Sequence, residues 1–197
     1  MYQVYGMAAS GNCYKVKLML SLLGETFTWH ECDPRQGATR TPAFLKLNPL
    51  GKVPVLVLPD GRPLPESNAI LCYLAEGSRW WPSDRFARAQ VLQWLFFEQY
   101  SHEPYVAVAR AIQLFYPQRA AELPALIAKG EAALQVMEQH LGRHDYLVGE
   151  TATIADLALY AYTHVAEEGG FSLRNYPALN RWLERITELP GFIPMQA

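Results

Sequence analysis

Apolar and polar positions in the first third of the chain repeat with two different periods. Runs rich in β-branched and aromatic residues predict strands, over residues 2–5, 27–32 and 53–58. Apolar residues at helical spacing predict helices, over residues 13–23, 42–47 and 66–76. The Asp60-Gly61 turn predicts a hairpin that pairs residues 62–64 with the third strand. The expected order, β-α-β-α-β-β-α, is typical of a compact mixed-sheet domain.

Beyond residue 77 the pattern is helical throughout. The GSRWWPS segment at 77–83 is typical of a linker. Helices are predicted from a cap at Ser83 through Tyr116, over 124–141, from Thr153, and over 177–189. Thr153 and Asp156 have the spacing of a capping box. We therefore expect an α/β domain over residues 1–77 and an all-helical bundle over residues 83–197.

Composition narrows the class of protein. The 197 residues are 50% hydrophobic and 18% charged, with a net charge of −2, so polyanion binding has no electrostatic basis and nucleic acid is not an expected partner. No apolar run approaches the ~20 residues that cross a bilayer, and the first residues do not resemble a signal peptide. The three cysteines form no CxxC pair, which argues against a disulfide scaffold or a structural zinc site. We expect a cytoplasmic protein without metal or membrane partner.

The loop before the first predicted helix offers polar side chains where an anion would be favoured. Ser10, Asn12 and Cys13 lie at the start of that helix, where backbone N–H groups and the helix dipole attract negative charge. A thiolate would be stabilised there. The alternative is that Ser10 and Asn12 only cap the helix and that Cys13 is a small buried residue.

Two other short motifs stand at the starts of elements. Pro54 near the start of the third strand is compatible with a cis turn that leaves Val53 to pair with an extended ligand, or with an ordinary edge-strand proline. Glu66 and Ser67 open the third helix, where they would grip a carboxylate and an ammonium group, or serve as ordinary helix-start residues. Each motif is weak alone, and their order along the chain gives them weight.

Taken together, the motifs resemble the glutathione transferase family. The strings that carry the resemblance are LNPLGKVPVL, LPESNAILCYL, FEQYSHEPYVAVAR and GxxxTIAD, which begin at residues 47, 64, 97 and 149. They follow in the family's order and cover nearly the whole chain. The resemblance implies a thioredoxin-like domain followed by a helical domain, with glutathione as co-substrate and a homodimeric assembly.

The resemblance also implies roles for particular residues. Pro54 would be the cis proline, and the Val53 backbone would pair with the cysteinyl part of glutathione. Glu66 and Ser67 would hold the γ-glutamyl end. Lys52 would lie near the glycyl carboxylate, with Arg40 or Thr39 as further contacts.

Four side chains are candidates for the contact with the glutathione sulfur. The SGNCYKV spacing resembles serine-type members and places the catalytic hydroxyl on Ser10. Asn12 ranks second, Cys13 third and Tyr5 fourth, since other classes of the family use asparagine, cysteine or tyrosine.

The helical domain is expected to shape the pocket for the second substrate. Tyr100, His102, Tyr105 and Arg110 lie in the relevant stretch, although core packing explains most of such positions equally well. His102 would act as an acid or orient a leaving group, or be a surface or interface histidine. Trp80, Trp81 and Phe96 or Phe97 are candidates for burial at an interface, and the i,i+4 spacing of His140 and His144 is interpreted as coincidence rather than a metal site.

Three functions fit these residues. The first is conjugation of glutathione to a hydrophobic electrophile, as in detoxification. The second is glutathione-dependent reduction of a peroxide or a disulfide, which needs the same thiolate. The third is a non-catalytic glutathione-binding module that keeps the fold.

Overall fold

The N-terminal part of the chain folds around a mixed β-sheet. The protein is described from a computed structural model, which describes residues 1–196. Its first elements are β1 (Tyr2–Gly6), α1 (Gly11–Leu22), β2 (Phe27–Glu31), α2 (Pro42–Leu47), β3 (Val55–Val57), β4 (Pro63–Pro65) and α3 (Ser67–Ala75). Among residues 1–196 the sheet has four strands in the order β2-β1-β3-β4, with β1 parallel to β2 and the other pairs antiparallel. The predicted order of elements is confirmed.

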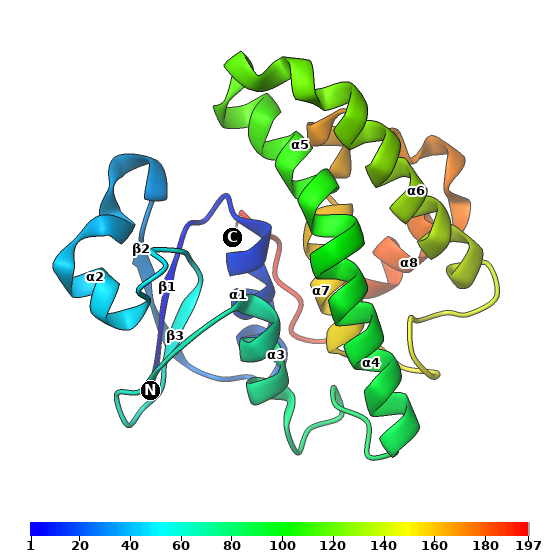
Figure 1. The fold of residues 1–197 in the computed structure, drawn as a ribbon. Coiled ribbons are helices and arrows are strands. Elements are labelled where there is room, and N and C mark those ends of the chain that lie inside the picture. The colour runs from blue at the N-terminus through cyan, green and yellow to red at the C-terminus, as the bar shows by residue number, and fades with distance from the viewer. Residues whose placement is uncertain (197) are drawn as a thin grey trace. The chain divides into compact units, whose positions relative to one another are not determined.

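The two faces of this sheet are covered by different helices. Alternate residues of β1 point to opposite faces: Val4 is fully buried, while the neighbouring Tyr5 packs edge-on against Phe44 of α2 at 6.3 Å. Figure 1 shows α1 and α3 side by side on one side of the sheet and α2 on the other. The sheet therefore serves as the platform from which α1 and α3 both begin.

The end of the chain returns to this first unit. The compact unit comprises Met1–Ser78 and the segment that begins at Leu189. The Tyr14 hydroxyl of α1 donates to the carbonyl of Ile193 at 2.7 Å, and the Ser21 hydroxyl donates to the carbonyl of Gly191 at 2.7 Å. These bonds hold the returning segment against α1.

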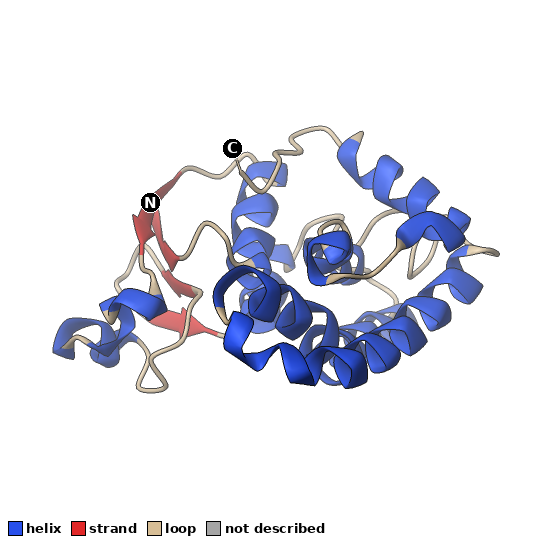
Figure 2. Cartoon of the chain, turned by 90° about the horizontal axis from the view of Figure 1, so that it is seen from above, coloured by secondary structure: helices blue, strands red, loops and turns tan. Residues whose placement is uncertain are grey.

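The second compact unit, Arg79–Glu188, is built from helices (Figure 2). They are α4 (Arg85–Phe97), α5 (Glu103–Phe115), α6 (Leu123–Leu141), α7 (Ile154–Thr163) and α8 (Pro177–Thr187). Short 3₁₀ turns stand at Pro34–Gln36, Ala38–Arg40, Pro117–Glu122, Ala166–Gly169 and Leu173–Asn175. No strand occurs between residues 79 and 196. The predicted class, α/β followed by all-α, is confirmed.

The predicted single helix from Ser83 to Tyr116 is wrong in two respects. The cap is Asp84, whose carboxylate accepts the Ala87 N–H at 2.8 Å, rather than Ser83. The helix is also interrupted by a π-helical turn over Glu98–His102, followed directly by α5. Pro104 at the start of α5 has no N–H to donate, and its ring excludes regular α-helical geometry over the preceding turn. The last helix, α8, ends at Thr187, two residues before the predicted end at Leu189.

A buried carboxylate organises the centre of the helical unit. Thr153 and Asp156 form the expected capping box at the start of α7, a helix whose ten residues are all buried. Asp156 accepts N–H bonds from Leu147 at 2.9 Å, Thr153 at 2.8 Å and the indole of Trp182 at 3.0 Å. Burial raises the pKa of Asp156, and these donors oppose that shift. One side chain thus ties the loop before α7 to α8.

Asp156→Asn is expected to destabilise the protein by about 3–5 kcal/mol, because an amide replaces one acceptor oxygen with a donor facing buried N–H groups. The free energy of unfolding in urea measures this. Glu150→Gln, an equal charge change at an exposed position nearby, serves as control and should stay within about 0.5 kcal/mol of the unchanged protein. Equal stability of the two variants would contradict this role for Asp156.

Candidate functional site

The N-terminal turns of α1 and α3 meet, and this meeting defines the candidate site. Ser67, the first residue of α3, donates its hydroxyl proton to the Asn12 side-chain oxygen in the first turn of α1, at 3.3 Å. The first N–H groups of a helix have no partner within the helix, and the dipole adds positive potential there. Two such ends at one place make this a candidate site for an anion.

Ser10 is the N-cap of α1, as the sequence predicts. Its backbone is extended, and its Oγ accepts the Cys13 N–H at 3.4 Å. That bond uses the oxygen as acceptor, so the hydroxyl proton is available for a second partner. The side chain is half-buried at the mouth of the helix.

Glu66 has an unusual backbone conformation at the start of α3. Its φ of 72° makes it the one non-glycine residue with positive φ among residues 1–196, and its side chain is exposed and makes no capping bond. Such a conformation costs about 1–3 kcal/mol, and residues that hold it cluster at functional sites. The strained backbone therefore marks Glu66 as a candidate binding residue at the start of α3.

The turn before β3 carries the other predicted residues. The Val53–Pro54 peptide bond is cis, as expected, and the β3 ladder begins at Val55, which leaves Val53 outside it. Lys52 is exposed, and its carbonyl accepts from the Asn48 amide at 2.9 Å.

Arg40 lies against this turn. Its Nη1 donates to the carbonyl of Leu50 at 3.4 Å, and a Cβ added at Gly51, where φ is +63°, would lie only 2.6 Å from the same nitrogen. Arg40 is exposed whereas Thr39 is buried. The fold therefore brings the Arg40 side chain beside the Gly51-Lys52 turn.

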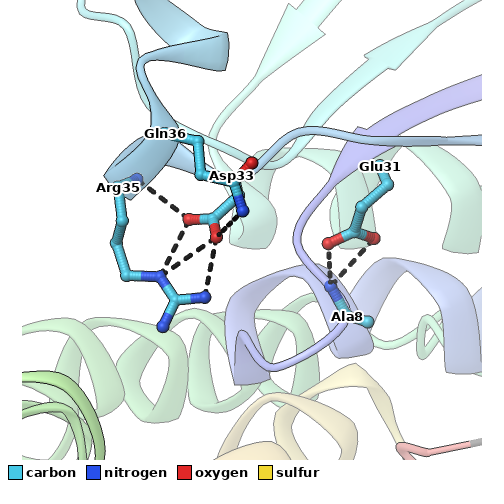
Figure 3. Close-up of polar contacts among 5 residues, drawn as sticks. All are labelled: Ala8, Glu31, Asp33, Arg35 and Gln36. Atoms are coloured by element: carbon cyan, nitrogen blue, oxygen red, sulfur yellow. Dashed lines mark hydrogen bonds and ion pairs between the residues drawn. The ribbon is translucent and has the colours of Figure 1, made fainter.

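The loop that leads to Ser10 is held by Glu31 at the end of β2. The Glu31 carboxylate accepts the Ala8 N–H at 3.1 and 3.2 Å through its two oxygens (Figure 3), and the Trp29 indole N–H at 2.8 Å. The loop is thus fixed at Ala8, two residues before Ser10.

Asp33 orders the segment that carries Arg40. Its carboxylate accepts from the Arg35 backbone N–H at 2.9 Å, the Arg35 guanidinium at 2.7 Å and the Gln36 amide at 3.2 Å (Figure 3). Hydrogen bonding to Arg35 lowers the pKa of Asp33 to about 2. This turn therefore keeps its ion pair throughout the neutral and mildly acidic range.

Comparison with known proteins decides the family. The model described as "Glutathione S-transferase, N-terminal domain" matches residues 9–76, and "Glutathione S-transferase, C-terminal domain" matches residues 91–190. Glutathione S-transferase 2 of Anopheles gambiae is 32% identical over 201 aligned residues, covering 97% of this chain and 93% of that protein. The chain belongs to the glutathione S-transferase family.

Solved structures agree with this assignment. A glutathione S-transferase from Pseudomonas fluorescens is 56% identical, covers 100% of this chain and 99% of that chain, and has a TM-score of 0.97. A second family member from the same organism, solved with two glutathione molecules bound, is 27% identical over 96% of this chain and 89% of that chain, with a TM-score of 0.84. The thioredoxin-like fold is confirmed, and the family assignment makes this chain a glutathione transferase, with glutathione as its co-substrate.

Two of the four candidates for the sulfur contact, Cys13 and Tyr5, are packed against other residues of this transferase. Cys13 is fully buried, accepts the Met7 N–H at 3.4 Å, and burial raises the pKa of its thiol to about 11. The Tyr5 ring stacks on His30 at 4.5 Å and joins the core cluster around Phe44. These contacts favour structural roles for both and leave Ser10 and Asn12 as the predicted contacts.

The predicted pocket residues of the helical unit differ in their surroundings. His102 is fully buried and shares a hydrogen bond with the Thr163 hydroxyl at 3.0 Å, so it is neither a surface nor an accessible interface histidine. Tyr100 is 83% exposed, and Arg110 pairs with Glu168 at 2.7 Å. Tyr105 is half-buried beneath Lys129, whose Nζ lies 5.2 Å from the ring centroid. A hydrogen bond and an ion pair within the helical unit therefore explain the burial of His102 and Arg110.

The aromatic residues predicted for burial at an interface differ in their exposure. Trp80 is buried and its carbonyl accepts the Ile154 N–H at 3.2 Å, whereas Phe96 is 69% exposed. His140 and His144 stack at 4.6 Å, and residues 1–196 contain no group of three side chains suited to hold a metal ion. No helix in the same range is both long and apolar enough to cross a membrane.

Sequence reasoning missed residues that surround the site. Lys15 is fully buried on α1, Asn68 lies beside it on α3, and Glu31 anchors the loop of Ser10. The signal for Lys15 was a cation among the apolar residues of an otherwise buried helix stripe. Nothing in the sequence marked Glu31, since its partner is a backbone N–H distant in the chain.

Cys13 of the folded transferase is expected to resist alkylation. With a pKa near 11, its thiolate fraction at pH 8 is on the order of one in a thousand, and the thiol is fully buried. Peptide mapping after iodoacetamide treatment measures this, with the partly exposed Cys72 as the faster-labelled control. Rapid stoichiometric labelling of Cys13 in folded protein would restore it as a reactive residue.

Proposed function

We propose that this transferase binds glutathione where α1 and α3 begin, and ionises its thiol for attack on a hydrophobic electrophile. The observation that carries the proposal is the 3.3 Å contact between Ser67 and Asn12, which brings two helix N-termini to one place. Glutathione offers a carboxylate and a thiolate, and both are favoured by helix N-termini.

The γ-glutamyl end of glutathione is assigned to the start of α3. The Ser67 hydroxyl is engaged with Asn12, so the backbone N–H groups of the first turn are the donors for the γ-glutamyl carboxylate. The exposed Glu66 carboxylate, held at φ 72°, is the partner for the ammonium group. A charge-assisted hydrogen bond of this kind contributes about 1.5–3 kcal/mol.

The remainder of the tripeptide is assigned to the turn before β3. Val53 lies outside the β3 ladder, and its backbone would pair with the cysteinyl residue. Lys52 and Arg40, on the two sides of Gly51, would attract the glycyl carboxylate. In this proposed arrangement the cysteinyl sulfur would face the start of α1.

Ser10 is proposed to stabilise the thiolate. A free thiol has a pKa of about 8.5, so only a few per cent ionises at neutral pH. Lowering this pKa by about two units requires roughly 2.7 kcal/mol, within reach of one hydroxyl donor aided by the helix dipole. Asn12, whose amide offers N–H donors, is the second candidate.

The thiolate then attacks the electrophilic carbon, forming a carbon–sulfur bond while the leaving group departs with its electron pair. Residues 1–77 are proposed as the glutathione-binding domain, and residues 83–197 as the domain that supplies the second-substrate pocket. We further propose a cytoplasmic homodimer that acts in detoxification. The exposed apolar side chains of Phe86, Phe96 and Tyr100 support association of the helical domain with another subunit.

Reduction of a disulfide by glutathione is a second candidate function. This reaction consumes two glutathione thiols and yields one glutathione disulfide, and a Pseudomonas fluorescens relative was solved with two glutathione bound. Peroxide reduction likewise consumes two glutathione thiols and yields glutathione disulfide. An electrophile panel, a peroxide and a small disulfide, assayed in parallel, separate these reactions, and binding without any turnover would indicate a non-catalytic module.

Ser10→Gly is expected to lower kcat/KM for the electrophile, measured at saturating glutathione and pH 6.5, about a hundredfold, and to move its pH profile toward the pKa of free glutathione. Glycine retains most of the capping preference, so the helix start is preserved. Ser10→Thr keeps the hydroxyl and the cap, and is the matched control that should retain activity. The pH dependence of kcat/KM in the three proteins checks this.

An unshifted profile in Ser10→Gly would remove Ser10 from this role. The same measurement on Asn12→Ala then decides whether the amide is the sulfur contact.

A further inference from the structure

A buried lysine lies directly behind the proposed glutathione site. Lys15 is fully buried in α1, one turn after Asn12. Its Nζ lies 3.4 Å from the Ser67 hydroxyl oxygen and 3.3 Å from the Asn68 side-chain oxygen, both in the first turn of α3. Burying an ammonium group is costly unless polar groups surround it. The Ser67 and Asn68 oxygens supply such groups and hold the Lys15 ammonium group between the two helix starts.

The chemistry of the ammonium group fixes the direction of the hydrogen bonds. An ammonium group donates and cannot accept, so the Ser67 oxygen must accept from Lys15. The one proton of the Ser67 hydroxyl is then directed to the Asn12 oxygen at 3.3 Å. Because that oxygen accepts the Ser67 proton, the orientation of the Asn12 side-chain amide is set by the same chain of hydrogen bonds.

The same contacts hold the N-terminal turns of α1 and α3 together. The three contacts span 3.3 to 3.4 Å, longer than an ordinary N–H···O bond of about 2.9–3.0 Å, so no single one of them dominates. The shared ammonium group joins Asn68 and Ser67 of α3 to α1, and places positive charge behind both helix N-termini. In a low-dielectric interior that charge acts over several ångströms.

We propose that Lys15 is a positioning residue for glutathione, which sets the polarity of the Ser67 and Asn12 side chains and holds the two helix starts together. It does not touch the tripeptide. The inference rests on the proposed function, because it assigns Lys15 a role in that same site. Its expected effect is on glutathione binding rather than on the pocket for the electrophile.

Lys15→Met, which keeps the length of the side chain and removes the donors, tests this in the full-length enzyme. The KM for glutathione is expected to rise about tenfold, equivalent to about 1.4 kcal/mol, while the KM for the electrophile changes less than about twofold. Lys17→Met is the matched control, since Lys17 lies on the same helix, half-buried, with its Nζ 5.9 Å from the Trp29 ring. It should leave both constants unchanged.

A merely structural lysine would give a different pattern. Loss of active protein lowers kcat with both KM values unchanged, and that result would overturn the proposal. A double-mutant cycle with Asn12→Ala adds a second readout, because residues of one network are non-additive. Full additivity of Lys15→Met and Asn12→Ala also counts against it.

If Lys15→Met does not fold, the network is tested with Lys15 in place. Asn68→Ala removes one acceptor of the ammonium group and is expected to weaken glutathione binding about threefold, with non-additivity toward Asn12→Ala. Unchanged affinity in Asn68→Ala overturns the inference. The unmodified enzyme is titrated alongside: its failure to bind glutathione would refute the proposed function itself, whereas intact binding with indifferent variants refutes the role of Lys15 alone.

Discussion

The candidate site of the first unit depends on one set of contacts between α1 and α3, made by Asn12, Lys15 and Ser67. Each helix end alone offers unpaired N–H groups and a partial positive charge. A 3.3 Å side-chain contact joins them, and we propose that the two ends together attract a small anionic thiol. The sheet supports this arrangement by placing α1 and α3 on the same face (Figure 1).

The helical unit has an independent centre, the buried carboxylate of Asp156. It receives hydrogen bonds from the loop before α7 and from Trp182 of α8, so the unit carries its own polar organisation within its apolar core. At the π-helical turn over Glu98–His102, the chain accommodates Pro104 by widening one turn instead of ending the helix. Function in such a fold is carried by side chains added to a framework that is stable for other reasons.

Much of this could be predicted from local patterns. The capping box and α2 over Pro42–Leu47 have short-range signals, and the structure contains both. The cis proline at residue 54, which local sequence left open, followed from the family resemblance. The π-helical turn and the cap at Asp84 were missed, because competing caps and helix distortions depend on small differences in backbone geometry. Lys15 and Glu31 were missed for another reason. Their partners lie 52 and 23 residues away, and only the folded chain brings them together.

The central claim is that the two helix starts bind glutathione and ionise its thiol. Calorimetric titration of the purified protein at pH 6.5, repeated in buffers of different ionisation enthalpy, tests it most directly. The account predicts saturable binding with release of about half a proton per site at pH 6.5, since a thiol whose pKa falls from about 8.5 to about 6.5 on binding becomes about half ionised at that pH. Absence of binding at millimolar glutathione, or binding without proton release, would contradict it.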